Sequence, residues 1–556
     1  MKIGFCRLAL LFYIVLRCQT AQSQDIGSLK DTFKVSGSVG LRGIAYRAGG
    51  IDNRRTPFSY VLNGNLTLSK GAFSIPLSFT YSEQDRSVSQ PFNQFGIAPS
   101  YKWLKIYAGY NNVSWSNYTM NGHQILGGGF ELTPKKLRLG FMYGRLHRQS
   151  DIDSNLYNNY LPTFLRTGLT AKIGYGKDNN FIDLVWFRGK DQAKGDIRFY
   201  NDTNIIVHPA DNNVLGIKTR KQLGKHLQFY LDGGISAYNR DIYALEVPFE
   251  GLTGIAGAAV SALRPTISMN IYSAIETGLQ INAAGQQIGL QFKRVDPDYK
   301  SMGSYFIEND LQSFMLNHAT SFWKGKISLQ YSIERYTDNL QNKKEFTTTR
   351  YQPNVNIGFN PSTFWGLSAN WSNLYTSQRD GSIVLSDTVR MKQSNPGITI
   401  SPYLNFGDTS YYHVISTNYT NMRLIDFNRF TAGFSQYTTQ VLNVQYMLSV
   451  LSKQTGFLLG ANRTANQTQA FDEKGFGVSL GFNQSFAQGK SSAQAAINGQ
   501  FSDVNNTFSL NSGYNRTFKH QQSASANLNW MLNRAKILQG RDYNELTFLI
   551  TYQKNF

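Results

Sequence analysis

The side chains that could perform catalysis are scattered along this 556-residue chain. None of the seven histidines belongs to a nucleophile motif such as G-x-S-x-G. No Gly-rich phosphate loop and no metal-ligand spacing occurs, and Gly127-Gly128-Gly129 falls inside a strand-like segment, which favours a bent or closely packed strand. We therefore predict a non-enzymatic protein with no catalytic residue, no cofactor and no metal site. The histidines are His123, His147, His208, His226, His318, His413 and His520.

Charged side chains instead recur within segments in which apolar and polar residues alternate. Such alternation places apolar residues on one face of a strand and charged residues on the other. If the aromatic-rich face meets lipid, the opposite face lines a lumen. The lumen-lining candidates are Arg42, Arg138, Arg166, Lys172, Asp183, Lys218, Arg220, Asp232, Glu276, Lys293, Glu334 and Arg350. Their basic excess predicts a mildly basic lumen that favours anions or an acidic partner, with ordinary solvated wall charges as the alternative.

The alternating segments predict β-strands along the whole body of the chain. Residues 58–69 and 73–82 alternate on either side of Lys70-Gly71, as in a β-hairpin. We count about 26 strands of roughly 9–16 residues, within a range of about 22–26.

Proline cannot donate a hydrogen bond to the ladder of a β-sheet, so each proline inside a proposed strand predicts a bulge or a shifted strand boundary. These prolines are Pro76, Pro99, Pro353 and Pro402.

The connections between these strands alternate between short turns and longer polar loops. This alternation predicts an all-β, transmembrane, antiparallel up-and-down barrel with short periplasmic turns and longer extracellular loops. A soluble repeat array is the alternative. A piece rich in Ala and Gly, residues 254–263, is expected to form a short helix within one loop.

The composition excludes several other classes of protein. Aromatic residues make up 14% of the chain, which excludes disorder, and two cysteines cannot staple 556 residues. The mean hydropathy of −0.34 disfavours a bundle of membrane helices. The net charge is +20, but the basic residues are dispersed, so no nucleic-acid partner is expected.

The N-terminus predicts a secretory signal. Lys2 and Arg7 precede a short apolar stretch, and small residues follow it. We expect a signal peptide over 1–23, a short periplasmic segment over 24–32 and one barrel over 33–556. Cys6 and Cys18 lie inside the signal, so the mature chain would contain no cysteine.

Aromatic residues mark the expected membrane interfaces. Trp103, Trp323 and Trp365 lie at predicted short turns, and Trp115 and Tyr118 near a predicted long-loop end, as two aromatic girdles would require.

The C-terminus resembles the recognition signal of outer-membrane barrels. Phe548, Ile550 and Tyr552 alternate with other residues in a final strand that ends at Phe556, although Lys554 departs from the pattern.

The chain therefore resembles outer-membrane β-barrel proteins of Gram-negative bacteria, those of the Bacteroidota in particular. Supporting segments are Ala21-Gln22-Ser23-Gln24, residues 295–303, Glu308-Asn309-Asp310-Leu311 and Asp338-Asn339-Leu340. The resemblance implies an integral outer-membrane location, with membrane lipids and the barrel-assembly machinery as partners. It implies no activity, because fold does not fix function.

The size of the barrel shapes the functional expectation. A barrel of about 26 strands has a backbone diameter of roughly 50 Å, and an open hole of that width would destroy the membrane barrier. The barrel must be flattened, or loops or another subunit must fill it. We predict the barrel subunit of a larger envelope complex for transport, export or assembly, with protein partners. A stand-alone porin-like solute channel is the alternative, and a barrel-type outer-membrane hydrolase is a remote one.

Overall fold

The computed structural model describes residues 33–82, 94–149, 163–192, 207–248, 253–261, 263–384, 386–469, 471–537 and 540–556. The expected signal peptide (1–23) and periplasmic segment (24–32) lie outside the described residues. The strands of the first half are β1 Lys34–Gly49, β2 Phe58–Lys70, β3 Phe73–Ser82, β4 Gln94–Ile97, β5 Ser100–Tyr101, β6 Leu104–Ser116, β7 Met120–Leu132, β8 Leu137–His147, β9 Leu165–Lys177, β10 Asn180–Gln192, β11 Asp211–Leu223, β12 Leu227–Asn239 and β13 Met269–Ala283. The strands of the second half are β14 Gln286–Val295, β15 Leu311–Phe322, β16 Ile327–Asp338, β17 Phe346–Phe359, β18 Trp365–Asp380, β19 Lys392–Gly407, β20 Tyr411–Asp426, β21 Tyr437–Val450, β22 Thr455–Thr468, β23 Asp472–Phe486, β24 Ser491–Ser502, β25 Asn505–Phe518, β26 Gln522–Ala535 and β27 Tyr543–Asn555.

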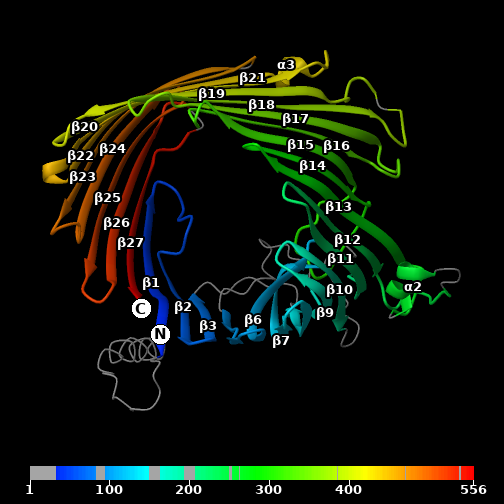
Figure 1. The fold of residues 1–556 in the computed structure, drawn as a ribbon. Helices are drawn as coiled ribbons and strands as arrows, with labels where there is room; N and C mark the ends of the chain where they lie inside the picture. Colours follow the sequence, from blue (N-terminus) through cyan, green and yellow to red (C-terminus); the bar gives the residue numbers. More distant parts are fainter. Residues whose placement is uncertain are drawn as a thin grey trace, which may run out of the picture.

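The strands form one closed antiparallel barrel (Figure 1). Apart from β4 and β5, each strand pairs with its neighbours in the sequence, and the ring closes where β1 pairs with β27, from Ser38↔Asn555 to Gly49↔Asn544. The short strands β4 and β5 both lie between β3 and β6. The 27 strands therefore fill 26 positions, and the predicted fold class is confirmed.

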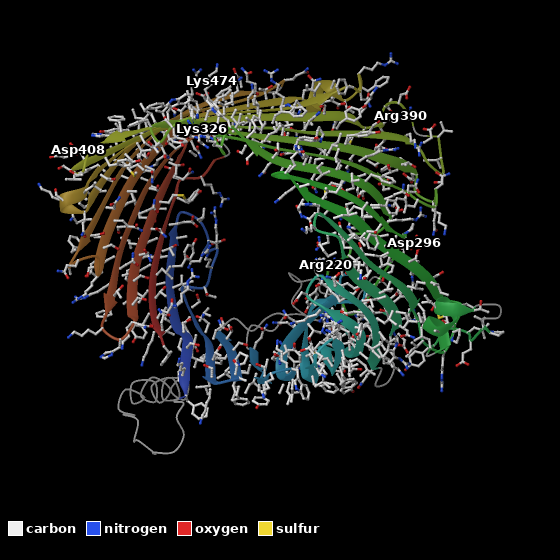
Figure 2. The ribbon with its side chains drawn as sticks, viewed as in Figure 1. Arg220, Asp296, Lys326, Arg390, Asp408 and Lys474 are labelled. Carbon is white, nitrogen blue, oxygen red and sulfur yellow. The ribbon has the colours of Figure 1, made fainter. Side chains whose placement is uncertain are left out.

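The register assigns every strand residue to the inner or the outer face, because directly paired residues point to the same side of a sheet. On β10, Ile182 and Leu184 are 47% and 54% exposed, whereas Asp183 and Val185 are buried. Arg220 shares the face of Asp183, and Figure 2 shows it on the side of the strands toward the interior of the ring. The exposed apolar face is therefore the outside of the barrel.

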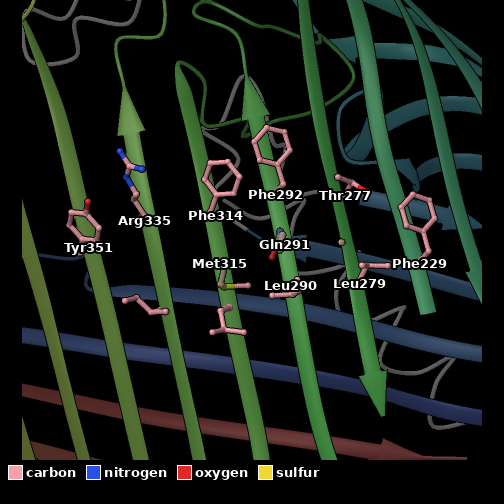
Figure 3. A pocket seen from close by; sticks show the side chains of 13 residues that line it. Phe229, Thr277, Leu279, Leu290, Gln291, Phe292, Phe314, Met315, Arg335 and Tyr351 are labelled. Atoms are coloured by element: carbon pink, nitrogen blue, oxygen red, sulfur yellow. The ribbon is translucent and has the colours of Figure 1, made fainter. Parts of the chain in front are cut away.

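The outer face carries a continuous apolar and aromatic surface. Figure 3 shows part of it across β12 to β17, where Phe292 and Phe314 lie with ring centroids 4.9 Å apart. Arg335 lies beside Tyr351 on the same surface, 6.0 Å from its ring centroid. A wall of this kind is suited to contact with lipid tails.

The two ends of the barrel differ in the length of their connections. At the short-turn end the chain turns within a few residues, as at 71–72 and 178–179, whereas the other end, the long-loop end, carries loops such as 240–268. Asp408 and Arg390 flank β19 and lie at opposite ends of it in Figure 2. The predicted alternation is not strict, because residues 117–119, 469–471 and 503–504 make short connections at the long-loop end.

The prolines fit into the ladder without the predicted bulges. Around Pro353 the pairing of β17 with β18 passes from Tyr351↔Tyr375 to Asn354↔Ser372 without a change of register. Pro402 lies in a similar gap between β19 and β20. Pro99 separates β4 from β5, and Pro76 lies within β3 at the gap between their pairings. Each proline therefore interrupts pairing locally and leaves the register intact.

Helices are few in the described residues: α2 Gly254–Ser261, α3 Ala432–Ser435 and a 3-10 turn at Leu451–Lys453. None of these helices is long and apolar enough to cross a membrane. The expected short helix within residues 254–263 is α2, which lies outside the ring of strands (Figure 1). Ala259 and Val260 of α2 pack with outer-face residues of β11 to β13, such as Ile235.

The assignment of faces predicts opposite effects for two adjacent residues of β23. Leu480 is on the outer face and 58% exposed, and Ser479 is on the inner face. We expect Leu480→Arg to lower the free energy of unfolding in lipid vesicles by about 2–4 kcal/mol, because an arginine near the middle of the lipid-facing band is poorly solvated. Ser479→Arg should change it by less than about 1 kcal/mol. Equal losses in denaturant titrations would contradict this assignment.

Candidate functional site

A row of charged residues crosses the inner face of the barrel. The register links neighbouring strands in the order Arg138, Gly174, Asp183, Lys218, Asp232, Glu276, Lys293, Ser313, Tyr336 and Arg350. Seven of the twelve lumen-lining candidates therefore lie in one row. The pairing also places Arg42, Arg166, Lys172, Arg220 and Glu334 on the inner face. That they line a transport path remains a prediction.

Several of these charges are paired with one another. Arg138 donates two hydrogen bonds to Asp183, with Nε–Oδ1 2.7 Å and Nη2–Oδ2 2.9 Å. Arg166 donates to Asp191 in the same bidentate way. The Nζ atom of Lys218 lies 3.6 Å from Oδ2 of Asp232. Such pairs fix side-chain geometry and reduce the positive charge that the basic residues present to the lumen.

The hairpin of β6 and β7 leaves the wall at its tip. β7 begins at Met120 but pairs with β8 only from Leu126 onward. The pairing of β6 with β7 is irregular between Asn112 and Ser116, which bends the hairpin. Residues 113–125 therefore fold inward.

The tip of this hairpin is held on the inner wall by two carboxylates. Asp232 of β12 accepts hydrogen bonds from the hydroxyl of Ser116 at 2.6 Å and from the backbone N–H of Asn117 at 3.0 Å. Glu276 of β13 accepts a bond from the Tyr118 hydroxyl at 3.1 Å. The strands β12 and β13 thus anchor a segment more than a hundred residues earlier in the chain.

The β14–β15 loop, residues 296–310, covers the hairpin tip. The Tyr299 hydroxyl donates to the carbonyl of Tyr118 at 2.7 Å, and the Ser301 hydroxyl donates to the carbonyl of Thr119 at 2.6 Å. The backbone N–H of Met302 donates to Asn212 on the inner face of β11 at 2.9 Å. Residues 113–125 and 296–310 together form a single layer, the inner layer, against the inside of β8 to β13.

Burial keeps the phenols of this layer neutral. Burial and the Glu276 carboxylate raise the pKa of Tyr118, and burial with the nearby Asp232 charge raises the pKa of Tyr299. Both hydroxyls therefore remain hydrogen-bond donors at physiological pH.

Trp115 continues the inner layer toward β9. Its indole N–H donates to Glu131 at 2.8 Å, and the Lys172 Nζ lies 4.9 Å from the centroid of the Trp115 ring and 3.5 Å from Glu131. Trp115 and Tyr118 are only 5% and 3% exposed. The prediction that they belong to an interfacial girdle is therefore wrong, because the bent hairpin carries both into the lumen.

Glycines on the inner wall make room for the layer. A Cβ atom at Gly140 would lie 2.7 Å from the Trp115 ring, and one at Gly216 would lie 2.0 Å from the Thr119 hydroxyl. Gly127 and Gly129 are also closely packed, as predicted, since their Cβ atoms would meet carbonyls of β8. Sequence reasoning gave loops that fill the barrel as one possibility but did not identify the two segments of the inner layer, for which glycines on the charged face were a signal.

Other basic candidates have no acidic partner. Within the described part of the chain, no ion pair involves Arg42, Lys293 or Arg350, although Arg350 lies over the Tyr336 ring at 5.1 Å. In the same described residues, no group of three or more His, Cys, Asp or Glu side chains could hold a metal ion.

A closed barrel with an apolar outer wall, a charged inner wall and an inner layer defines a large outer-membrane β-barrel. In its fold it is structurally similar to Occ/OprD-type outer-membrane channels of Gram-negative bacteria. No protein-family model and no curated protein matches the sequence.

Three crystal structures from Pseudomonas aeruginosa illustrate this similarity. OccK10 (OpdN) has a TM-score of 0.34 and 10% identity, with 66% of this chain and 98% of that chain covered. OpdL has a TM-score of 0.34 and 11% identity, with 70% and 99% covered. OpdK, crystallised with vanillate, has a TM-score of 0.30 and 10% identity, with 94% and 99% covered. These likenesses concern the barrel architecture, and the functional argument depends on the geometry of this chain.

The anchoring of the hairpin tip can be tested by thiol labelling. Thr119 is fully buried within the inner layer, so a Thr119→Cys thiol should react slowly with maleimide in the mature chain. Asp232→Ala removes the acceptor for Ser116 and Asn117, and we expect the labelling rate to rise at least about tenfold. Glu334→Ala, which removes an inner-face carboxylate outside the layer, is the control. An unchanged rate in the Asp232→Ala variant would show that this carboxylate does not hold the tip.

Proposed function

We propose that this protein is a solute channel of the outer membrane. The observation that carries the proposal is the inner layer, which is held against the wall by hydrogen bonds that it donates to Asp232, Glu276 and Asn212. A barrel of this circumference needs such an element to narrow its lumen, and loops folded against the inner wall narrow it while leaving a path for solutes. This supports the porin-like alternative over the complex subunit predicted first.

The charges of the inner face suggest which solutes pass. Arg138, Arg166 and Lys218 are each paired with a carboxylate near or beneath the layer, so they contribute little field to the lumen. Lys293 and Arg350 lie farther along the same row, on β14 and β17, and form no ion pair in the described residues, although Lys293 is opposite Glu276 in the ladder. Basic side chains exposed to a water-filled lumen attract anions, and we infer a preference for small anionic solutes.

Two other functions remain as competitors. A barrel subunit of an envelope complex would need a partner to close the lumen, and a barrel-type hydrolase would need a catalytic constellation. The inner layer favours neither, because segments of this chain build it and its residues Ser116, Asn117, Tyr299 and Ser301 are engaged in hydrogen bonds.

Planar-bilayer recording tests the proposal and its selectivity together. We expect the purified protein to give defined conductance steps, and a reversal potential in a salt gradient that shows anion preference. The double variant Lys293→Glu/Arg350→Glu should shift the anion-to-cation permeability ratio toward cations by about threefold or more, because two unpaired charges change sign.

Lys324→Glu is the matched control, since Lys324 lies in the 323–326 turn at the short-turn end. It should leave the permeability ratio unchanged. A protein that is silent in the bilayer, and that extracts with a stoichiometric partner in gentle detergent, would favour the complex subunit instead.

A further inference from the structure

Three basic residues gather on the outer face at the long-loop end of β8 and β10. The register aligns Arg145 of β8 with Thr167 of β9, Thr167 with Lys190 of β10, and Lys190 with Asp211 of β11. Arg188 lies two residues from Lys190 on β10, on the same face. Since neighbouring strands are about 4.8 Å apart, the backbones of Arg145 and Lys190 are separated by roughly 10 Å.

These side chains keep a net positive charge. Asp211 is the acidic group that faces them in the described part of the chain, and its Oδ2 accepts a hydrogen bond from Arg188 at 3.0 Å. Arg145 donates a hydrogen bond to the neutral Tyr110 hydroxyl at 3.4 Å, and Lys190 is exposed. Among the described residues one carboxylate therefore opposes three cations, at the long-loop rim of the outer wall, where basic side chains can meet anionic lipid headgroups.

An apolar groove runs along the outer wall directly below these charges. Outer-face side chains of β9 to β13 line it, and α2 contributes Ile255, which is 62% exposed, at one edge. Trp186 lies next to Arg188 on the same face of β10, and its indole N–H donates to Asn213. Asn213 in turn donates to the carbonyl of Ala259 in α2 at 2.7 Å, so the helix is fastened to the wall. Other lining residues are Ile173, Leu184, Leu215, Ile217 and Ile275.

We propose that this surface binds a phosphate-bearing lipid of the outer leaflet. Its headgroup phosphate lies against Arg145, Arg188 and Lys190, and its acyl chains fill the groove beside α2. Charge complementarity selects this occupant, because an anionic headgroup matches the basic cluster while the apolar lining matches hydrocarbon. A groove on the lipid-facing wall is also reached directly from the bilayer.

Native mass spectrometry of the mature protein in detergent can measure this binding. The probes are dioleoyl phosphatidic acid and dioleoylglycerol, which share acyl chains and differ in the phosphate. We expect phosphatidic acid to bind at least about tenfold more tightly, and Arg145→Gln/Lys190→Gln to weaken it about thirtyfold. The single variant Lys190→Glu, at an exposed position, should weaken binding in the same direction if the double variant folds poorly.

The matched control is Lys392→Gln/Arg423→Gln, which removes two outer-face basic residues from β19 and β20, away from the groove. It should leave the affinity of the first bound lipid unchanged. The proposal is overturned if the two lipids bind equally, if the control weakens binding as much as the groove variant, or if inorganic phosphate alone displaces the lipid at equimolar concentration. Binding of a second copy of the chain in place of lipid would overturn it too.

Discussion

The requirement that every backbone N–H and C=O group be paired inside a bilayer governs this structure. Twenty-six strand positions satisfy it only because the last strand returns to the first, and the Phe556 N–H extends this seam by donating to the Gly37 carbonyl. The prolines are tolerated because they lie in short pairing gaps with an unchanged register. A register error of one residue would exchange the two faces, so closure also decides which side chains meet lipid and which meet the lumen.

Closing a barrel of 26 strand positions creates a second requirement. The wall alone encloses a lumen that is too wide, so this lumen must be narrowed. The chain meets this requirement by bending the tip of the β6–β7 hairpin into the lumen and covering that tip with the β14–β15 loop. Carboxylates hold this arrangement. Asp232 accepts hydrogen bonds from the hydroxyl of Ser116 and the backbone N–H of Asn117, and it also lies near Lys218. Buried charges with several donors seldom add much net stability, but leaving one unpaired is costly. They therefore specify where the layer sits.

Much of the fold could be predicted from the sequence, and the site only in part. Period-2 alternation is a local property, so it indicated the strands and their inner faces without knowledge of distant contacts, and the local Ala- and Gly-rich composition indicated the short helix α2. Trp115 and Tyr118 could not be placed in this way. Their positions depend on Glu131, Asp232 and Glu276, which lie up to 158 residues away, and on a bend that begins at a register irregularity. The short connections at the long-loop end, such as 503–504, were missed because turn length alone does not reveal which end of a barrel it closes.

The same alternation separates the positive charge of the chain into two populations. On the inner face, Arg138, Arg166 and Lys172 are neutralised by carboxylates within the wall, since a buried charge must be paired. On the outer face an acidic partner would have to be desolvated by lipid, so basic residues there gather near the rim, where water and headgroups can solvate them. Arg145 and Lys190 belong to this second population. Within the described residues, Lys293 and Arg350 of the inner face form no ion pair, and in the proposed channel they would contribute to the field of the lumen.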